Sequence, residues 1–324
     1  MTKRIILLRN DMLGDLILTL PLIKSLKDAN NATLIDIVVQ QKFHSFARSL
    51  PWIHNVIPVN NDLRDYRVIG KLRKNKYDIA IDCIPGSTYY SSLLLASIRA
   101  KKKVGYAVGI RKFFLDTKVH AKSLQYETEL VLELARSIGY KASHNLILPI
   151  PAKDEDYIKR WLKKNKIQKV AVLCPGGISK TRRWPSERFA RVADSITKSK
   201  WKVIISGSEN EKKISKMIQY HMNSEAIDMT GVLSITRLCA LIKYADLVIT
   251  NNSAPMHIAA AFNTPQIVLS GPSSPIRWDP KNKNAIIIRK TTQFEEELRK
   301  STCGDDSIMK IETEEVIAAV NKII

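Results

Sequence analysis

The sequence predicts an α/β protein with two domains, each built on a mainly parallel sheet covered by helices. Short apolar runs rich in β-branched residues alternate with stretches of helical spacing along the chain. This alternation restarts after Pro149 and Pro151, and 324 residues are many for one hydrophobic core. We expect one domain over residues 1–150 and a second over 151–324, with a closing helix that can pack back on the N-terminal domain.

In the first domain, four strands are expected to alternate with three helices. The strand candidates are short Ile-, Val- and Leu-rich runs, at residues 3–8, 33–39, 77–83 and 102–107. The helix candidates place apolar residues three or four positions apart, over 13–29, 62–75 and 87–100. Alternating strands and helices of this kind imply parallel strands with helices on both faces of the sheet.

The second domain repeats the pattern. Helices are expected over residues 155–165, 186–199, 209–222, 234–244, 255–262 and 313–323. Strands are expected over 169–175, 201–207, 226–229, 246–250, 266–271 and 285–289. Ligands of open parallel sheets bind beyond the carboxyl ends of the strands, so the informative residues should lie in the turns that follow strands.

The chain is strongly basic, with a formal net charge of +21 and an excess of Lys and Arg in both halves. Such a surface attracts polyanions, either nucleic acid or an anionic membrane face, although an A/T-rich genome that favours Lys would give the same excess. No apolar run approaches the roughly 20 residues that span a bilayer. The first residues predict a strand rather than a signal peptide, which favours a cytoplasmic protein.

The cysteines and histidines do not predict a metal site. Cys83, Cys174, Cys239 and Cys303 are far apart and favour reduced thiols over a disulfide framework. The histidines show no metal-ligand spacing. There is also no GxSxG elbow, no GxGxxG fingerprint and no Walker A motif.

Two turns carry acidic residues that either cap a helix or meet a ligand. Gly14 and Asp15 follow the first strand; Gly14 would allow close approach of a ligand, while Asp15 also suits an ordinary first helical turn. Glu209 and Glu211 follow the strand at 201–207. They could accept hydrogen bonds from ribose hydroxyls or simply complement a helix dipole.

Two further turns have the composition of a phosphate site. The segment GGISKTRRWP at 176–185 supplies glycine amides, the hydroxyls of Ser179 and Thr181, and cations that include Arg182 and Arg183. The segment TNNSAPMH at 250–257 follows a strand and opens a helix, whose free amides form an anion site. Together these turns indicate a nucleotide diphosphate.

Three segments together resemble glycosyltransferase family 9, the ADP-heptose:lipopolysaccharide heptosyltransferases. They are GDLILTLPLIKSLK, CPGGISKTRRWPSERFARVA and the long stretch from MTGVLSITRL through TNNSAPMH to GPSSP. The resemblance covers nearly the whole chain in the same order. It implies a GT-B architecture of two facing Rossmann-like domains, with the acceptor held by the first and the nucleotide-sugar by the second.

The resemblance also implies an inverting, metal-independent transfer of heptose from ADP-heptose to the Kdo/heptose inner core of lipopolysaccharide or lipooligosaccharide. Asp15 matches the general base, and Arg182 matches a position that is usually Lys, whose cation steadies the departing diphosphate. The remaining donor contacts that it implies are Ser179, Thr181, Arg183, Glu211, less securely Glu209, and the turn residues Asn252, Ser253, Ala254, Met256 and His257. No cofactor besides the nucleotide-sugar is implied.

The net charge then suggests an anionic glycolipid acceptor, met by an enzyme bound peripherally at the cytosolic face of the inner membrane of a Gram-negative bacterium. The candidate contacts beside Gly14 are the basic residues Lys101, Lys102, Lys103, Arg111 and Lys112. Nucleic acid is not an expected partner.

Two departures from the family turn leave alternatives open. Asn252 stands where the family has Asp, and Ala254 stands where it has Gly. Asn keeps an acceptor oxygen but loses the charge, so a different nucleotide-sugar donor is an alternative. Ala254 would be strained only if the turn needs a positive φ. A non-catalytic, polyanion-binding protein is the alternative from another class, and the Asp15 and Arg182 matches argue against it.

Overall fold

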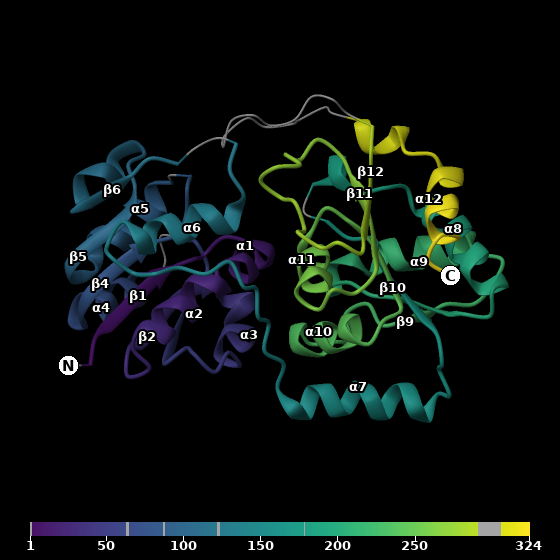
Figure 1. The fold of residues 1–324 in the computed structure, drawn as a ribbon, viewed down its shortest axis with the longest axis horizontal. Coiled ribbons are helices and arrows are strands. Elements are labelled where there is room, and N and C mark those ends of the chain that lie inside the picture. The colour runs from purple at the N-terminus through teal and green to yellow at the C-terminus, as the bar shows by residue number, and fades with distance from the viewer. Residues whose placement is uncertain (1, 63–64, 87, 122–123, 178, 291–305) are drawn as a thin grey trace. The chain divides into compact units, whose positions relative to one another are not determined.

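The computed structural model describes residues 2–62, 65–86, 88–121, 124–177, 179–290 and 306–324. The chain divides into two compact units, one ending at Pro149 and the other beginning at Ile150, beside the prolines where the sequence pattern restarts. In the part of the chain that is described, each unit contains a six-stranded parallel sheet (Figure 1). The predicted α/β fold class is therefore correct.

Unit 1 holds a sheet whose strands run in the order 3-2-1-4-5-6. Its strands, in spatial order, are β3 (Asn55–Val59), β2 (Leu34–Gln40), β1 (Arg4–Leu8), β4 (Lys76–Asp82), β5 (Arg99–Tyr106) and β6 (Thr117–Val119). Its helices are α1 (Leu13–Leu18), α2 (Leu20–Ala29), α3 (His44–Arg48), α4 (Tyr66–Lys74), α5 (Tyr89–Ser97) and α6 (Glu127–Arg136), with 3-10 turns η1 (Gln41–Phe43) and η2 (Gly109–Phe114).

Unit 2 has a sheet of the same doubly wound kind. Its strands, in spatial order, are β12 (Ala285–Arg289), β11 (Gln266–Ser270), β10 (Leu247–Asn251), β7 (Val170–Cys174), β8 (Lys202–Ile205) and β9 (Ile227–Asp228). Its helices are α7 (Ala152–Lys164), α8 (Ser186–Lys198), α9 (Lys212–His221), α10 (Ile235–Lys243), α11 (Ala254–Ala261) and α12 (Thr313–Val320), with 3-10 turns η3 (Lys180–Arg182), η4 (Glu209–Glu211) and η5 (Ser307–Lys310).

Apolar burial explains why these runs form central strands. Ile5–Leu8 of β1 and Val170–Cys174 of β7 are buried along their length, as expected for strands covered on both faces. In unit 1, α2 packs against α6 and α4 packs against α5; in unit 2, α8 packs against α9 and α12, and α10 against α7 and α11. Among the described residues, no helix is long and apolar enough to cross a membrane.

The closing helix, α12, completes the core of unit 2. Helix α12 packs against α8, β11 and β12 of unit 2. Val316 and Val320 are fully buried in the same apolar core as Trp184 and Phe189. Because these side chains complete that core, α12 is an integral part of unit 2.

The sheet order sets the place of a ligand site in each unit. In unit 1, successive strands run outward in one direction from β1 and in the other from β4, and β1 pairs with β4. In unit 2 the same reversal occurs between β7 and β10, which also pair. Loops leave the carboxyl ends of such a strand pair in opposite directions, and the crevice between them is the usual binding position of α/β sheets.

Candidate active site

Asp15 lies beyond the carboxyl end of β1, at the reversal point of unit 1. It occupies the first turn of α1, where a carboxylate is favoured by the helix dipole. The N-cap position belongs to Met12, which makes no side-chain cap, so Asp15 does not serve as the helix cap. The Asp15 side chain is 15% exposed, which leaves its carboxylate access to solvent.

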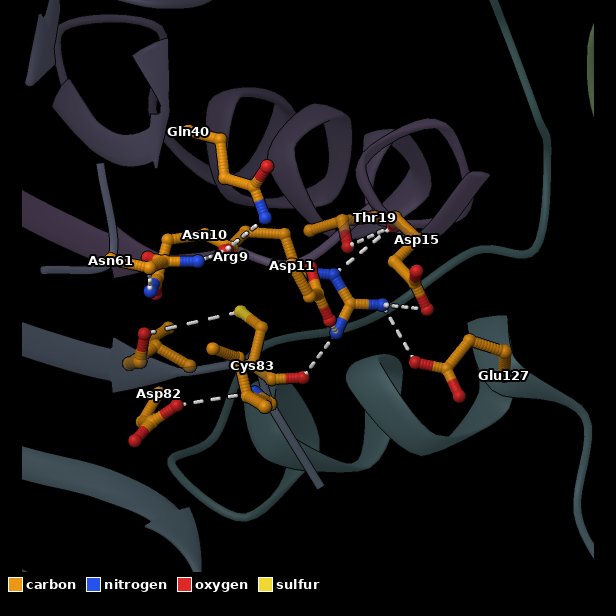
Figure 2. Close-up of polar contacts among 12 residues, drawn as sticks. Arg9, Asn10, Asp11, Asp15, Thr19, Gln40, Asn61, Asp82, Cys83 and Glu127 are labelled. Carbon is orange, nitrogen blue, oxygen red and sulfur yellow. Dashed lines mark hydrogen bonds and ion pairs between the residues drawn. The ribbon is translucent and has the colours of Figure 1, made fainter. Parts of the chain in front are cut away.

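The fully buried Arg9 organises this turn (Figure 2). Its Nη2 donates to Glu127 Oε1 at 2.6 Å and lies 3.6 Å from Asp15 Oδ1, and its Nη1 lies 3.2 Å from Asp11 Oδ2. Its Nε donates to the Asp15 carbonyl at 3.1 Å and its Nη1 to the Cys83 carbonyl at 2.6 Å. One guanidinium therefore ties the Asp15 turn to the end of β4 and to helix α6.

Three carboxyl groups surround the single guanidinium of Arg9, so acidic groups outnumber basic ones in this cluster. Burial alone would lower the pKa of Arg9, but the carboxylates of Asp11, Glu127 and Asp15 more than offset it, so the pKa of Arg9 is raised. Burial raises the pKa of Asp11 well above its ordinary value, despite the nearby Arg9. Arg9 stays charged, and the raised pKa of Asp11 favours the protonated form of its carboxyl group.

In unit 2, the loop after β7 forms a compact cradle. Glu211 Oε1 accepts from the Gly177 amide at 3.1 Å, while its Oε2 accepts from the Ser208 amide at 2.6 Å. Arg183 Nε donates to the Gly177 carbonyl at 2.7 Å. A Cβ at Gly176 would overlap the Glu211 carboxylate, which explains the glycine at that position.

The predicted hydroxyls of this loop lie together. Ser179 Oγ and Thr181 Oγ1 are 2.6 Å apart, and Ser179 caps η3 by accepting from the Thr181 amide. Arg182 ends η3, partly exposed, one residue before Arg183. The loop thus gathers two hydroxyls and two guanidinium groups beyond the end of one strand.

The loop after β10 lies beside this cradle, because Thr250 pairs with Cys174 in the sheet. Asn251, which is fully buried, joins the two loops: its Nδ2 donates to the carbonyls of Pro175 and Gly176 at 2.7 and 3.0 Å, and its Oδ1 accepts from the Trp184 amide at 3.2 Å. The sequence analysis did not single out Asn251. A polar residue at the end of an otherwise apolar, buried strand is the sequence feature that could have indicated its role.

The TNNSAPMH turn opens α11 at Ala254. Ala254 does not have a positive φ, so the Cβ that replaces the family glycine causes no backbone strain. The Met256 amide already donates to the Ser253 carbonyl at 3.0 Å, which differs from its expected role as a free donor to a diphosphate. Asn252 is partly buried and His257 is almost fully buried beside Trp278.

The two candidate ribose contacts differ in their surroundings. Glu209 is 68% exposed and forms an ion pair with Lys212 at 2.6 Å. Glu211 is less exposed and holds the glycine loop in place, so its carboxylate has a structural task whatever else it binds. The Glu211 carboxylate reaches the loop after β7, whereas Glu209 faces the surface.

The basic residues proposed for the acceptor are not together. Arg111 is fully buried, with Nη1 bonded to Asp82 Oδ2 at 2.9 Å, so it is not a surface contact. Lys102 pairs with Ile79, which pairs with Ile5 near the start of β1; Lys101–Lys103 therefore lie toward the amino edge of the sheet, away from Asp15. Lys112 is exposed in η2, beyond the carboxyl end of β5.

The cysteines are buried thiols. Cys83, Cys174 and Cys239 are free, and burial raises the pKa of each thiol, so they stay protonated. Cys303 lies outside the described residues. No group of three or more His, Cys, Asp or Glu is arranged to hold a metal ion within the described ranges.

Comparison with known proteins gives the class of protein. Residues 66–306 match glycosyltransferase family 9 (heptosyltransferase). The chain is 22% identical to lipooligosaccharide heptosyltransferase 2 of Haemophilus ducreyi, with 99% of each covered. Its fold is similar to E. coli ADP-heptose lps heptosyltransferase II (TM-score 0.82, 21% identity, 99% and 98% covered) and to E. coli heptosyltransferase WaaC with ADP (TM-score 0.75, 18% identity, 99% and 100% covered).

These likenesses define a glycosyltransferase of GT-B fold, as the sequence predicted. The chain belongs to glycosyltransferase family 9, the heptosyltransferases.

Proposed function

We propose that this enzyme transfers heptose, with inversion and without a metal, from ADP-heptose to the Kdo/heptose inner core of lipopolysaccharide or lipooligosaccharide. Family membership and the relatives' names support the class of reaction. The observation that carries the proposal is the Asp15 carboxylate, held beyond β1 at the reversal point of unit 1 by the buried Arg9. The E. coli structure with ADP supports an adenine nucleotide as donor.

In the proposed reaction, an acceptor hydroxyl oxygen attacks the anomeric carbon while the bond from that carbon to the diphosphate oxygen breaks. Asp15 takes the hydroxyl proton as general base. ADP leaves with the bonding electrons, and the guanidinium of Arg182 stabilises the charge that develops on its diphosphate. Thr181 and Ser179 would donate hydroxyl hydrogen bonds to the phosphates.

The test is the Asp15→Asn variant, assayed for transfer from ADP-heptose and for ADP binding by calorimetry. Transfer should fall by about 100-fold or more, which is the usual contribution of a general base. ADP affinity should stay within twofold, because the donor is proposed to bind unit 2. Asp28→Asn is the control, since Asp28 is a 61% exposed carboxylate on the same unit. Wild-type turnover in Asp15→Asn would refute the assignment.

Arg182→Ala should weaken ADP binding roughly tenfold, about the value of one charge-assisted contact, with Arg182→Lys intermediate. Arg191→Ala is the matched control, because Arg191 is a 59% exposed arginine of unit 2 that pairs with Glu314. Equal ADP affinity in Arg182→Ala and Arg191→Ala would contradict the role of Arg182.

Asn252 favours a second candidate, a related transferase that uses a different nucleotide-sugar. It lies at the reversal point of unit 2. Its side-chain amide is uncharged, whereas the Asp that the family has at this position would present a negative charge to the donor sugar. Thermal stabilisation by a panel of ADP, UDP, GDP and their sugars separates the candidates, with RNA as control. The strongest stabilisation should come from ADP-heptose. Stabilisation by RNA alone would support a polyanion-binding protein and overturn the enzymatic proposal.

The acceptor that we propose is anchored in a bilayer, so we also propose that the enzyme works in the cytoplasm, peripherally at the inner membrane of a Gram-negative bacterium. The net charge of +21 supports contact with an anionic surface.

A further inference from the structure

One edge of unit 1 exposes a group of large apolar side chains, which we call the aromatic rim: Tyr66, Tyr89, Ile110, Phe113 and Phe114. Their exposed fractions are 65, 86, 49, 75 and 40%. Single exposed apolar residues are ordinary on a protein surface, whereas a contiguous group marks an interaction site. The question is therefore whether these five residues are neighbours.

The contacts of unit 1 place them on neighbouring elements. Helix α4 packs against α5, and α5 packs against η2. The Tyr90 hydroxyl donates to Asp65 Oδ2 at 2.7 Å, which brings Tyr89 and Tyr66, their chain neighbours, to the same end of the two helices. That end follows β3 and β4, and η2 follows β5. The rim thus lies on the carboxyl edge of the sheet, the edge that also carries Asp15.

The turn η2 is built to hold apolar side chains outward. Arg111 points inward from its middle to the fully buried Asp82, while Ile110, Phe113 and Phe114 remain exposed. The turn begins at Gly109, whose φ of 58° few other residues adopt. Because the Arg111–Asp82 bond ties the middle of the turn to the end of β4, it fixes which side of η2 faces the protein.

Cations accompany the exposed rings. Lys112 Nζ lies 5.1 Å from the centroid of the Phe113 ring, and the Arg67 guanidinium carbon lies 5.8 Å from that of Tyr66. Aromatic rings flanked by Lys and Arg match a membrane interface, where rings enter the headgroup layer and cationic heads reach lipid phosphates. Protein–protein interfaces, in contrast, are depleted in lysine.

We propose that the aromatic rim docks this enzyme on an anionic bilayer surface, with Phe113 and Ile110 entering the headgroup layer and Lys112 and Arg67 contacting lipid phosphates. Docking through this edge turns the Asp15 turn toward the membrane. The benefit to catalysis rests on the proposed bilayer-anchored acceptor, but vesicle binding itself does not. The rim replaces the lysines at 101–103 as the main contact surface, because those lie toward the opposite edge.

The test is cosedimentation of the full chain with vesicles of equal parts phosphatidylglycerol and phosphatidylcholine, and with phosphatidylcholine alone. The parent should bind the anionic vesicles. The double variant Ile110→Ser/Phe113→Ser should bind at least roughly tenfold more weakly, since each side chain would lose apolar burial. The control is Met217→Ser/Tyr220→Ser on α9, where the side chains are 48 and 80% exposed, and it should bind like the parent.

Two charge-reversal variants complete the test. Lys112→Glu should weaken anionic-vesicle binding more than Lys101→Glu, whose side chain is 82% exposed near the opposite edge. Unchanged thermal unfolding and ADP binding would show that each variant is folded. Parent-like vesicle binding by the Ile110→Ser/Phe113→Ser variant would overturn the proposal. So would a rim variant that only converts a dimer to a monomer in sedimentation velocity, which would make the rim a contact between copies of the chain.

The failure of this proposal is distinguishable from failure of the proposed function. Rim variants that lose vesicle binding but still transfer heptose to a detergent-solubilised acceptor support both. Rim-dependent vesicle binding without any heptose transfer by the parent supports docking and contradicts the proposed function.

Discussion

The buried pair of Arg9 and Glu127 gives the most direct test of how unit 1 positions Asp15. Both side chains are fully buried, and their charged atoms are 2.6 Å apart. Glu127→Gln keeps the size and an acceptor oxygen but removes the charge. Arg9 then keeps Asp11 and Asp15 as acidic neighbours, at 3.2 and 3.6 Å.

The expected loss of stability follows from this geometry. Removing one partner of a buried ion pair costs about 3–5 kcal/mol when the remaining charge has no other partner. Here Arg9 keeps two acidic neighbours and can still donate to the new amide oxygen, so we expect about 2–3 kcal/mol. Glu129→Gln is the matched control on the same helix. Glu129 is 24% exposed and pairs with Arg136 and His144, and exposed pairs of this kind contribute about 0–1 kcal/mol.

Activity should fall as well, because Arg9 holds the Asp15 turn through two groups at once. Its Nε donates to the Asp15 carbonyl while its Nη2 lies between Glu127 and the Asp15 carboxylate. Without the Glu127 charge the guanidinium can turn toward Asp15 and draw the base out of position. A misplacement of about 1 Å costs up to about 100-fold in rate, so kcat should fall by about 10- to 100-fold.

The assay combines urea unfolding, kcat with ADP-heptose and ADP binding. Since the proposed ADP site is in unit 2, ADP affinity should stay unchanged while kcat falls. Equal unfolding midpoints and equal kcat for Glu127→Gln and Glu129→Gln would refute the idea that the buried pair positions Asp15.

Three further changes test the structure elsewhere. Gly70 lies inside α4 with no atom within 4 Å of an added Cβ, so Gly70→Ala should raise stability by about 0.5–1 kcal/mol in urea unfolding; a loss would show that the site is crowded. Gly176→Ala should displace the Glu211 carboxylate and weaken ADP binding in calorimetry, and parent-like affinity would contradict a part for Glu211 in the ADP site. Hydrogen bonds from Tyr244 and Lys243 lower the pKa of Glu155 to about 2, from an ordinary value of 4.5. Because the folded-state pKa is the lower one, this stabilisation is present above pH 4.5 and is lost as the pH falls toward about 2. Glu155→Gln should therefore lower Tm at pH 7, and the difference from the parent should shrink at acid pH; a constant difference would contradict the assignment.

Two of the strands that the sequence did not predict, β3 and β6, have a weak local pattern. Strand β3 contains Pro58, which the backbone tolerates because β3 is an edge strand. Strand β6 has three residues at the opposite edge, too few to show the alternation of apolar and polar residues that is typical of a strand. Helix α6, over Glu127–Arg136, was also missed, although its apolar residues have helical spacing. The expected helix over 13–29 is two helices, with Pro21 in the first turn of the second.

The sequence by itself determined the class of fold and placed the candidate site residues in the turns that follow strands. Alternating apolar runs require parallel strands, because each run must be buried on both faces, and the glycine, hydroxyl and cationic residues fall directly after those strands. These properties are local in the chain, so one sequence suffices to find them.

Only the tertiary structure decided which distant residues share a charge or an edge. Arg9 meets Glu127, which is 118 positions away, and Asn251 joins two loops whose strands are far apart in sequence but adjacent in the sheet. In the folded chain Arg111 is buried against Asp82, whereas Phe113, two residues later, is exposed. Charge and apolarity are properties of a residue, whereas burial depends on what the rest of the fold places around it.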